Sequence, residues 1–323
     1  MPRNAGYAGA MVSPGLRLRW YATIPLLAGL VLAGPGGDSA AAETLRLLSY
    51  NTHGLPAWIA WDDPERRFPL IGDQTKRYDV VLLQEDFAHH ARLRESARQP
   101  LVARGNPSRM PVCPICTGSG LTSLVRPGRV ELVRKSQAHP YGVCAGWLGG
   151  SNDCFATKGF LWLRLRLANG AHLHVVNTHL DAGSADADRE ARARQLQILA
   201  DALERSAGHH ALVVAGDFNL DAAHPEDRAL RDAFMARLGL RDSGARPDPT
   251  APWRVIDYIL LRSGAEVELE VMEAGEDTDF VDGELPLSDH PALFVRLRVH
   301  TPADETGFSA WSTSHRPPGS PHR

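Results

Sequence analysis

The chain has 323 residues, of which 43% are hydrophobic, 23% charged and 7% aromatic. This balance is typical of a globular protein with one large core, and it excludes a chain that is mainly disordered. The formal net charge of −3 argues against the broad basic surface by which many proteins hold nucleic-acid phosphates, although an acidic chain can still cut DNA where basic groups gather locally.

The N-terminal segment has the features of a secretory leader. Arg17 and Arg19 precede an apolar run over residues 20–33, and small residues follow up to Ala42. We expect a signal peptide over residues 1–42, cleaved after Ala42, and a secreted or periplasmic mature protein, whichever of Met1 and Met11 is the true start. The alternative is a retained membrane anchor, but the run is shorter than the roughly 20 residues of a span. Cleavage would leave 32 basic and 37 acidic side chains, a net charge of −5.

Short apolar runs bounded by turn residues recur along the rest of the chain and predict buried strands. In chain order they are residues 45–50, 80–84, 121–125, 161–167, 173–177, 212–215, 255–261 and 292–299. Leucine and arginine alternate from Leu163 to Leu167, which is typical of a half-buried strand with its arginines in solvent.

Two helices are predicted among these strands. Residues 186–206 begin with acidic side chains and carry leucines on one stripe, and residues 226–238 carry a similar stripe and end at Gly239. Strands mixed with helices predict an α/β protein with packed sheets. We expect residues 43–300 to form one domain and the polar residues 301–323 to form a disordered tail.

All four cysteines fall within one short stretch of the chain. An even number of cysteines in an exported protein indicates disulfides, and proximity favours the pairs Cys113–Cys116 and Cys144–Cys154. The alternative is a zinc site with four thiolate ligands, for which the nine residues between the second pair are a loose spacing.

Polar side chains follow several predicted strands at the point where each strand ends, where loops can bring them to a shared cleft. A single Asn, Asp or His at such a place is usually a turn former, but six such motifs in one chain indicate a site. Oxygen ligands suit Mg²⁺, and histidines beside aspartates suit proton transfer near neutral pH. The motifs are S-Y-N (49–51), L-L-Q-E (82–85), N-T-H-L-D (177–181), G-D-F-N (216–219), I-D-Y-I-L (256–260) and S-D-H-P (288–291).

In this order the motifs resemble those of the endonuclease/exonuclease/phosphatase superfamily, which has the deoxyribonuclease I-like fold, over residues 45–299. The resemblance implies a two-sheet α/β sandwich with flanking helices and an active site at one edge of the sandwich. It also implies a metal-dependent phosphoric diester hydrolase that uses Mg²⁺, with Mn²⁺ or Co²⁺ as substitutes. Glu85 would be the main metal ligand with Asn51 beside it, and Asp289 would lie close to the metal or its waters.

The resemblance also implies roles in proton transfer and phosphate binding. His290, oriented by Asp257, would take the proton of the attacking water, with Asp217 as the alternative base. Asp217 and Asn219 would position the water and the scissile phosphate, and His179 would donate to a phosphoryl oxygen.

Within the superfamily, Lys158-Gly159-Phe160, the segment over residues 172–180 and Leu55-Pro56 are similar to the bacterial sphingomyelinases. This similarity implies hydrolysis of a phospholipid phosphodiester, as in the cleavage of sphingomyelin to ceramide and phosphocholine. Lys158 would contact phosphate or line the cleft, and the alternative is a surface lysine at a strand end. A secreted deoxyribonuclease is the second hypothesis, and a catalytically inactive binding domain is a distant third.

One region departs from the sphingomyelinase pattern. Secreted sphingomyelinases carry an exposed hairpin with adjacent bulky aromatics shortly before the S-D-H motif, whereas residues 273–283 here are acidic with one aromatic. We therefore expect Trp58 and Trp61, beside the first motif, to hold the protein at a phospholipid surface, with a core or lid position as the alternative. No obligate protein partner is inferred, and a monomer is expected.

Overall fold

The computed structural model describes residues 42–57, 62–97, 101–108, 117–147 and 153–301 of the chain. Trp58, Trp61, Cys113, Cys116 and nearly all of the predicted signal peptide and tail lie outside these ranges. Within them, no helix combines the length and the apolar character needed to cross a bilayer.

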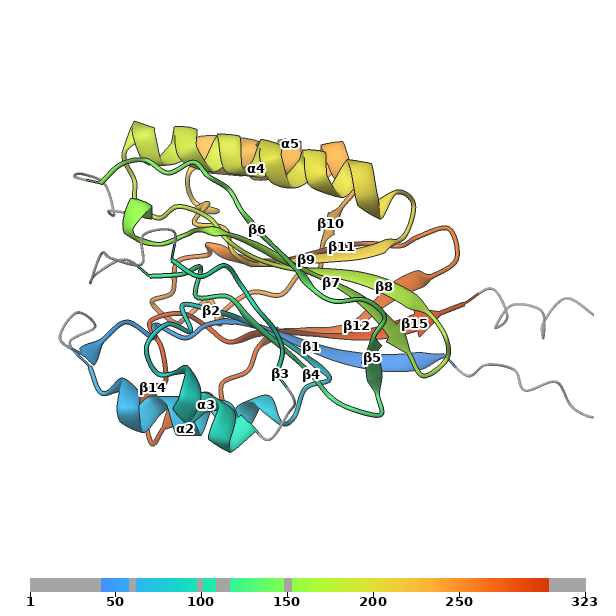
Figure 1. The fold of residues 1–323 in the computed structure, drawn as a ribbon, viewed down its shortest axis with the longest axis horizontal. Helices are drawn as coiled ribbons and strands as arrows, with labels where there is room; N and C mark the ends of the chain where they lie inside the picture. The colour runs from blue at the N-terminus through green and yellow to red at the C-terminus, as the bar shows by residue number, and fades with distance from the viewer. Residues whose placement is uncertain (1–41, 58–61, 98–100, 109–116, 148–152, 302–323) are drawn as a thin grey trace, which may run out of the picture. The chain divides into compact units, whose positions relative to one another are not determined.

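Two large mixed sheets face each other in the described domain (Figure 1). In spatial order the first contains β12 (Glu268–Glu276), β15 (Leu293–His300), β1 (Glu43–Asn51), β2 (Val80–Gln84), β4 (Thr122–Val125) and β3 (Leu101–Arg104). The second contains β10 (Arg241–Asp242), β11 (Asp257–Arg262), β9 (Ala211–Asp217), β8 (His172–His179), β7 (Gly159–Leu167) and β5 (Val130–Leu132), and β6 (Gln137–Pro140) also pairs with β7.

Helices cover the outer faces of both sheets (Figure 1). The first sheet is covered by α2 (Pro64–Thr75) and α3 (His90–Ala97), and the second by α4 (Asp186–Ala207) and α5 (Pro225–Leu238). Leucine and valine side chains from the inner faces of both sheets form a continuous core between them. The predicted two-sheet α/β sandwich with flanking helices is therefore confirmed.

The predicted elements match the observed ones closely. All eight predicted strands and both predicted helices are present, with ends that differ by at most two residues. Leu199 and Leu203 of α4 are buried against the second sheet, and α5 ends at Gly239, whose φ of 64° suits a residue without a side chain. In β7 the alternating leucines are buried and Arg166 is exposed. Periodicity therefore identified the buried faces correctly.

The strand register brings the polar strand ends together. In the second sheet β8 runs parallel to β9, so that His179 aligns with Asp217, and β11 aligns Asp257 with the same residue. In the first sheet β1 runs parallel to β2 and aligns Asn51 with Gln84, the residue before Glu85. His179 and Asp217 end their parallel strands, and Asp257 begins β11, which runs antiparallel to β9. One edge of the sandwich therefore collects these residues.

A short hairpin lies between the acidic end of β12 and the S-D-H motif. Residues 273–276 complete β12, and a short hairpin of β13 (Val281–Asp282) and β14 (Leu285–Pro286) follows. The one aromatic, Phe280, is buried and packs edge-on against Tyr50, so it belongs to the core. Leu285 is 71% exposed, which makes the hairpin aliphatic rather than aromatic at its surface.

Candidate active site

Asp217 lies at the centre of the cluster formed by the strand ends. Its Oδ2 accepts a hydrogen bond from Asn51 Nδ2 at 3.0 Å and lies 3.3 Å from His179 Nε2 and 3.8 Å from His290 Nε2. Its Oδ1 accepts the backbone N–H of Asn219 at 2.9 Å. A cluster predicted from separate motifs is thus assembled around one buried carboxylate.

The preceding glycine allows this carboxylate to lie so close to β8. Gly216 has a φ of 146°, and a Cβ built on it would lie 1.9 Å from the backbone oxygen of Thr178. Any side chain at this position would push β9 away from β8. Glycine before Asp217 therefore helps to set the separation between Asp217 and His179.

His290 and Asp257 form a hydrogen-bonded pair beside Asp217. His290 Nδ1 lies 2.8 Å from Asp257 Oδ2, and only 15% of the His290 side chain is exposed. Burial acts to lower the pKa of His290, but the negative charges of Asp257 and Asp217 outweigh it and raise the pKa to about 10. Burial raises the pKa of Asp257 to about 6, against the opposing charge of His290. The pair therefore holds a proton that is shared between adjacent groups.

Asp217 itself stays ionised. Burial alone would raise its pKa, but the charge and hydrogen bond of His179, followed by the charges of His290 and Lys158, hold the pKa well below its usual range. The carboxylate therefore provides a fixed negative charge between two histidines.

Glu85 faces the cluster from the first sheet. Its φ is 53°, a left-handed conformation that costs of order 1–3 kcal/mol in a residue with a side chain and that is concentrated at functional sites. Its side chain is 20% exposed, and among the described residues its carboxylate accepts no hydrogen bond; the nearest basic atom is His179 Nε2, at 4.0 Å. An ionisable oxygen ligand is thus available at the open edge.

Asn51 and Asp289 lie on the same side of the site as Glu85. The side-chain oxygen of Asn51 accepts the backbone N–H of His53 at 3.0 Å, which leaves it one lone pair for a further partner. The side chain of Asp289 is 58% exposed and lies 3.5 Å from His53 Nδ1. These oxygens, with Glu85, are of the type that Mg²⁺ prefers.

A second group of potential metal ligands lies deeper. Donor atoms of Asp217, Asp257 and His290 all lie within 4.8 Å of one another. Nδ1 of His290 is already bonded to Asp257, and Asp217 already accepts a hydrogen bond from Asn51, so these atoms have partners within the protein. We interpret this group as an acid–base relay and Glu85 as the carboxylate open to a cation.

Lys158 is part of the site, so its interpretation as a surface lysine is wrong. It is 6% exposed, and its Nζ lies 2.7 Å from His179 Nε2 and 3.1 Å from Asp153 Oδ1. The cause is the register of β7, which aligns Gly159 with His179. Burial acts to lower the pKa of Lys158, but nearby carboxylates, Asp153 first, raise it overall, so the amine stays charged.

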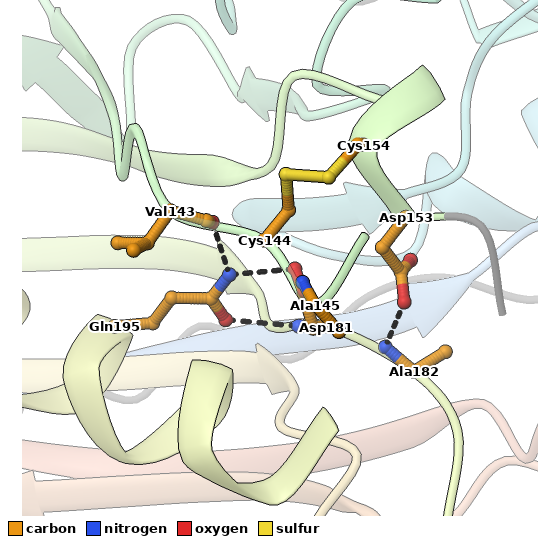
Figure 2. Close-up of a disulfide and its surroundings, with 8 residues drawn as sticks. All are labelled: Val143, Cys144, Ala145, Asp153, Cys154, Asp181, Ala182 and Gln195. Atoms are coloured by element: carbon orange, nitrogen blue, oxygen red, sulfur yellow. Dashed lines mark hydrogen bonds between the residues drawn. A yellow bond between two sulfur atoms is a disulfide. The ribbon is translucent and has the colours of Figure 1, made fainter. Parts of the chain in front are cut away.

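The Cys144–Cys154 disulfide is present, as predicted, and joins two segments beside the site (Figure 2). Its Cα atoms are 5.3 Å apart, a usual separation for a disulfide. A site with four zinc-bound thiolates is wrong, because these two sulfurs are bonded to each other. The Cys113–Cys116 pair, like Trp58 and Trp61, lies outside the described residues and stays a prediction.

Sequence reasoning missed the buried network behind Glu85. Asp86 is fully buried, and its Oδ2 accepts hydrogen bonds from Thr122 Oγ1 at 2.5 Å and Arg104 Nη1 at 2.8 Å, and lies 2.5 Å from His90 Nδ1. Arg104 also donates to the backbone oxygen of Asp86 at 2.8 Å. The only signal in the sequence was a second acidic residue directly after the L-L-Q-E motif.

Comparison with known proteins agrees with this geometry. A model of the Endonuclease/Exonuclease/phosphatase family matches residues 48–290. The sphingomyelinase of Mycobacterium bovis is 27% identical over 284 residues, a match that covers 82% of this chain and 55% of that protein. The chain therefore spans about half the length of this relative.

Solved structures share the fold at lower identity. A double mutant of beta toxin from Staphylococcus aureus with bound magnesium ions is 17% identical, with a TM-score of 0.57 and coverage of 79% of this chain and 99% of that one. D. rerio TDP2 complexed with a single-strand DNA product is 18% identical, also with a TM-score of 0.57 and the same coverage of the two chains. Together with the motif order and the two-sheet fold, the match over residues 48–290 means that the chain belongs to the Endonuclease/Exonuclease/phosphatase family.

Proposed function

We propose that the protein is an exported, Mg²⁺-dependent phosphodiesterase that hydrolyses a phospholipid of the sphingomyelin type. The observation that carries the proposal is the pairing, at one edge of the sandwich, of the open Glu85 carboxylate with the buried cluster of Asp217, His290 and Asp257. Metal-assisted hydrolysis of a phosphodiester requires an oxygen ligand for a hard cation and, close to it, a group that accepts the proton of the attacking water.

Glu85 and Asn51 would hold the cation, with Asp289 near its water molecules. Two observations on Glu85 support a cation at this position. Its carboxylate accepts no hydrogen bond from the described residues, and its backbone is held in a strained conformation. Bound Mg²⁺ would supply positive charge that polarises the phosphoryl oxygens and favours release of the imidazole proton. Mn²⁺ or Co²⁺ would serve as substitutes.

His290 is the better candidate for the general base. The depressed pKa of Asp217 makes that carboxylate a poor proton acceptor. His290 is oriented by Asp257 and would accept a proton once the charge of a bound cation has released the one that its raised pKa retains. Nε2 of His290 would take the proton of the attacking water, and Asp217 and Asn219 would position that water and the phosphate. His179, supported by the ammonium of Lys158, would donate to a phosphoryl oxygen as negative charge develops there.

A lipid substrate is favoured over DNA by the surface next to the site. Leu285 and Val281 expose aliphatic side chains on the hairpin that leads to Ser288, Asp289 and His290. Such side chains suit contact with a bilayer, and Trp58 and Trp61 are proposed to add to it. The similarity to the mycobacterial sphingomyelinase also favours a lipid substrate. A secreted deoxyribonuclease stays the second candidate, because TDP2, which shares the fold, was solved with a DNA product.

Export is proposed from the leader over residues 1–42, with residues 43–300 as the catalytic domain and residues 301–323 as a disordered tail. The Cys144–Cys154 disulfide supports export, because disulfides persist in oxidising compartments. The protein would act as a monomer in the medium or the periplasm.

One experiment separates the candidates. Purified mature protein is incubated with vesicles of sphingomyelin, phosphatidylcholine or a phosphoinositide, and with plasmid DNA, each with and without Mg²⁺. We expect Mg²⁺-dependent release of phosphocholine from sphingomyelin and intact plasmid. Cleavage of the plasmid alone would favour the nuclease, and inactivity on every substrate would favour a catalytically inactive binding domain.

A further inference from the structure

A pocket of about 380 Å³ adjoins the active site. Its lining includes Trp147, Phe155, both half-cystines of the Cys144–Cys154 disulfide, and Lys158. We name it the Trp147 pocket. Its volume lies within the range of about 300–1,000 Å³ that is usual for small-molecule sites.

The Trp147 pocket shares one wall with the catalytic cluster. Lys158 lines the pocket, and its Nζ lies 2.7 Å from His179 Nε2. A ligand in the pocket is therefore separated from the proposed phosphate position at His179 by a single side chain. This geometry suits one substrate molecule with its phosphate at His179 and an adjoining group in the pocket.

Two aromatic rings meet at a corner of the pocket. The ring centroids of Trp147 and Phe155 are 5.3 Å apart with an interplanar angle of 84°. Trp147 is 46% exposed, although large aromatic side chains of this kind are usually covered. The face of an indole ring attracts organic cations such as quaternary ammonium groups.

The surrounding charge also favours a cation. The ammonium of Lys158 forms an ion pair with Asp153 and interacts in addition with three further carboxylates, those of Glu85, Asp217 and Asp181. Asp153 and Asp181 lie close to the disulfide, where they accept backbone N–H groups of Ala182 and Ala145 (Figure 2). Four carboxylates thus surround a single ammonium, and such an arrangement favours a positively charged substituent over an anionic one.

The disulfide fixes the two aromatic walls relative to each other. Trp147 follows Cys144 by three residues, and Phe155 directly follows Cys154. The segments that carry the two rings are therefore covalently joined, so little conformational entropy is lost when a ligand enters between them.

We propose that the Trp147 pocket binds the quaternary ammonium group of a choline headgroup, through the face of Trp147 and the negative charge around Lys158, while the phosphate lies at His179. The inference rests on the proposed phosphodiesterase function and assigns the headgroup of its substrate. Trp147 and Phe155 are then specificity-determining residues and take no part in the chemical step.

The test uses two soluble esters that differ in one atom. One is p-nitrophenylphosphorylcholine, and the other is its isostere with a tert-butyl group in place of the trimethylammonium, which removes the positive charge of the headgroup. We expect Trp147→Ala to lower kcat/KM on the choline ester roughly tenfold and to leave kcat/KM on the tert-butyl ester nearly unchanged, because only the trimethylammonium gains from the ring face. Trp147→Phe should recover part of the loss. Val133→Ala, which removes an apolar side chain of similar exposure outside the pocket, is the matched control.

An equal decrease of kcat/KM on both esters would overturn the proposal, because Trp147 would then be a general apolar contact. An unchanged kcat/KM on both esters would overturn it as well. A direct binding measurement separates this failure from failure of the proposed function. By calorimetry with Mg²⁺, we expect the unsubstituted protein to bind phosphocholine more tightly than 3,3-dimethylbutyl phosphate, and Trp147→Ala to abolish the difference. Equal affinity for the two would overturn the pocket assignment even in an active phosphodiesterase, and a difference would support it even if neither ester were hydrolysed.

Discussion

The two sheets contribute to the active site in different ways. On the side of the first sheet, Glu85 and Asp289 have side chains that are 20% and 58% exposed, and Glu85 has a left-handed backbone. On the side of the second sheet, His179, Asp217 and Asp257 are at most 2% exposed and are bonded to one another or to His290. In the proposed mechanism a cation enters and exchanges water, which suits open carboxylates, whereas groups that exchange protons need fixed neighbours to set their pKa values.

The largest effect is expected at the open, exposed side of the site, which Glu85 and Asp289 form. Chelation should abolish turnover and Mg²⁺ should restore it, because Glu85 and Asn51 form the proposed cation site. Glu85→Ala should weaken the response to added Mg²⁺, which a titration of initial rate against metal concentration measures. Full activity in excess chelator would remove the metal from the mechanism.

The second largest effect is expected from a substitution at the buried side of the site, which His290, Asp217 and Asp257 form. His290→Ala should lower kcat by roughly 10² or more, the usual contribution of general acid–base catalysis, while Mg²⁺ binding measured by calorimetry stays largely intact. If the variant retains most of its rate, Asp217 rather than His290 takes the proton. The contrast with Glu85→Ala, which should change metal binding first, separates the two sides of the site.

A smaller effect is expected from the network that holds the open side in place. Asp86→Asn keeps the shape of the side chain but removes the charge that pairs with Arg104, so the strained loop at Glu85 should lose part of its support. We expect the Mg²⁺ concentration for half-maximal activity to rise about tenfold, with kcat at saturating Mg²⁺ within a factor of about three, the small change expected of a residue that touches no reacting atom.

The control for Asp86→Asn is Asp73→Asn, which removes an exposed ion pair between Asp73 of α2 and Lys76, the residue after the helix. It should leave the metal response unchanged. A lowered melting temperature for Asp86→Asn together with an unchanged metal response would show that the network only stabilises the fold.

The sequence predicted the strands, both long helices and the edge where the site lies, because hydrophobic periodicity and strand-end motifs are local features. The burial of Lys158 and the Asp86 network could not be predicted in this way. Lys158 is buried because the register of β7 and β8 aligns Gly159 with His179, and Oδ2 of Asp86 accepts hydrogen bonds from residues 18 and 36 positions away. Such contacts depend on tertiary packing, which a single sequence motif does not predict.

The smallest expected effect compares the two ends of β8. His179 lies at the active-site end, among carboxylates, whereas His174 lies five residues earlier, between the rings of His210 and Trp162. Burial, followed by the positive charges of His210, Arg164 and Arg262, lowers the pKa of His174 to about 4. The same strand thus carries one histidine next to negative charge and one next to positive charge.

The lowered pKa of His174 makes stability depend on pH with a definite sign. Above about pH 6.5 the residue is neutral in both the folded and the unfolded chain, so it has no effect. As the pH falls from 6.5 towards 4, the unfolded chain takes up a proton that the folded protein does not, and the free energy of unfolding decreases by on the order of 2 kcal/mol before levelling off. His174→Gln should remove this part of the decrease, measured by urea unfolding at pH 7 and pH 4.5, whereas the exposed His209→Gln should keep it. The same decrease in both variants would mean that His174 is protonated in the folded protein, and the contrast between the two ends of β8 would then be lost.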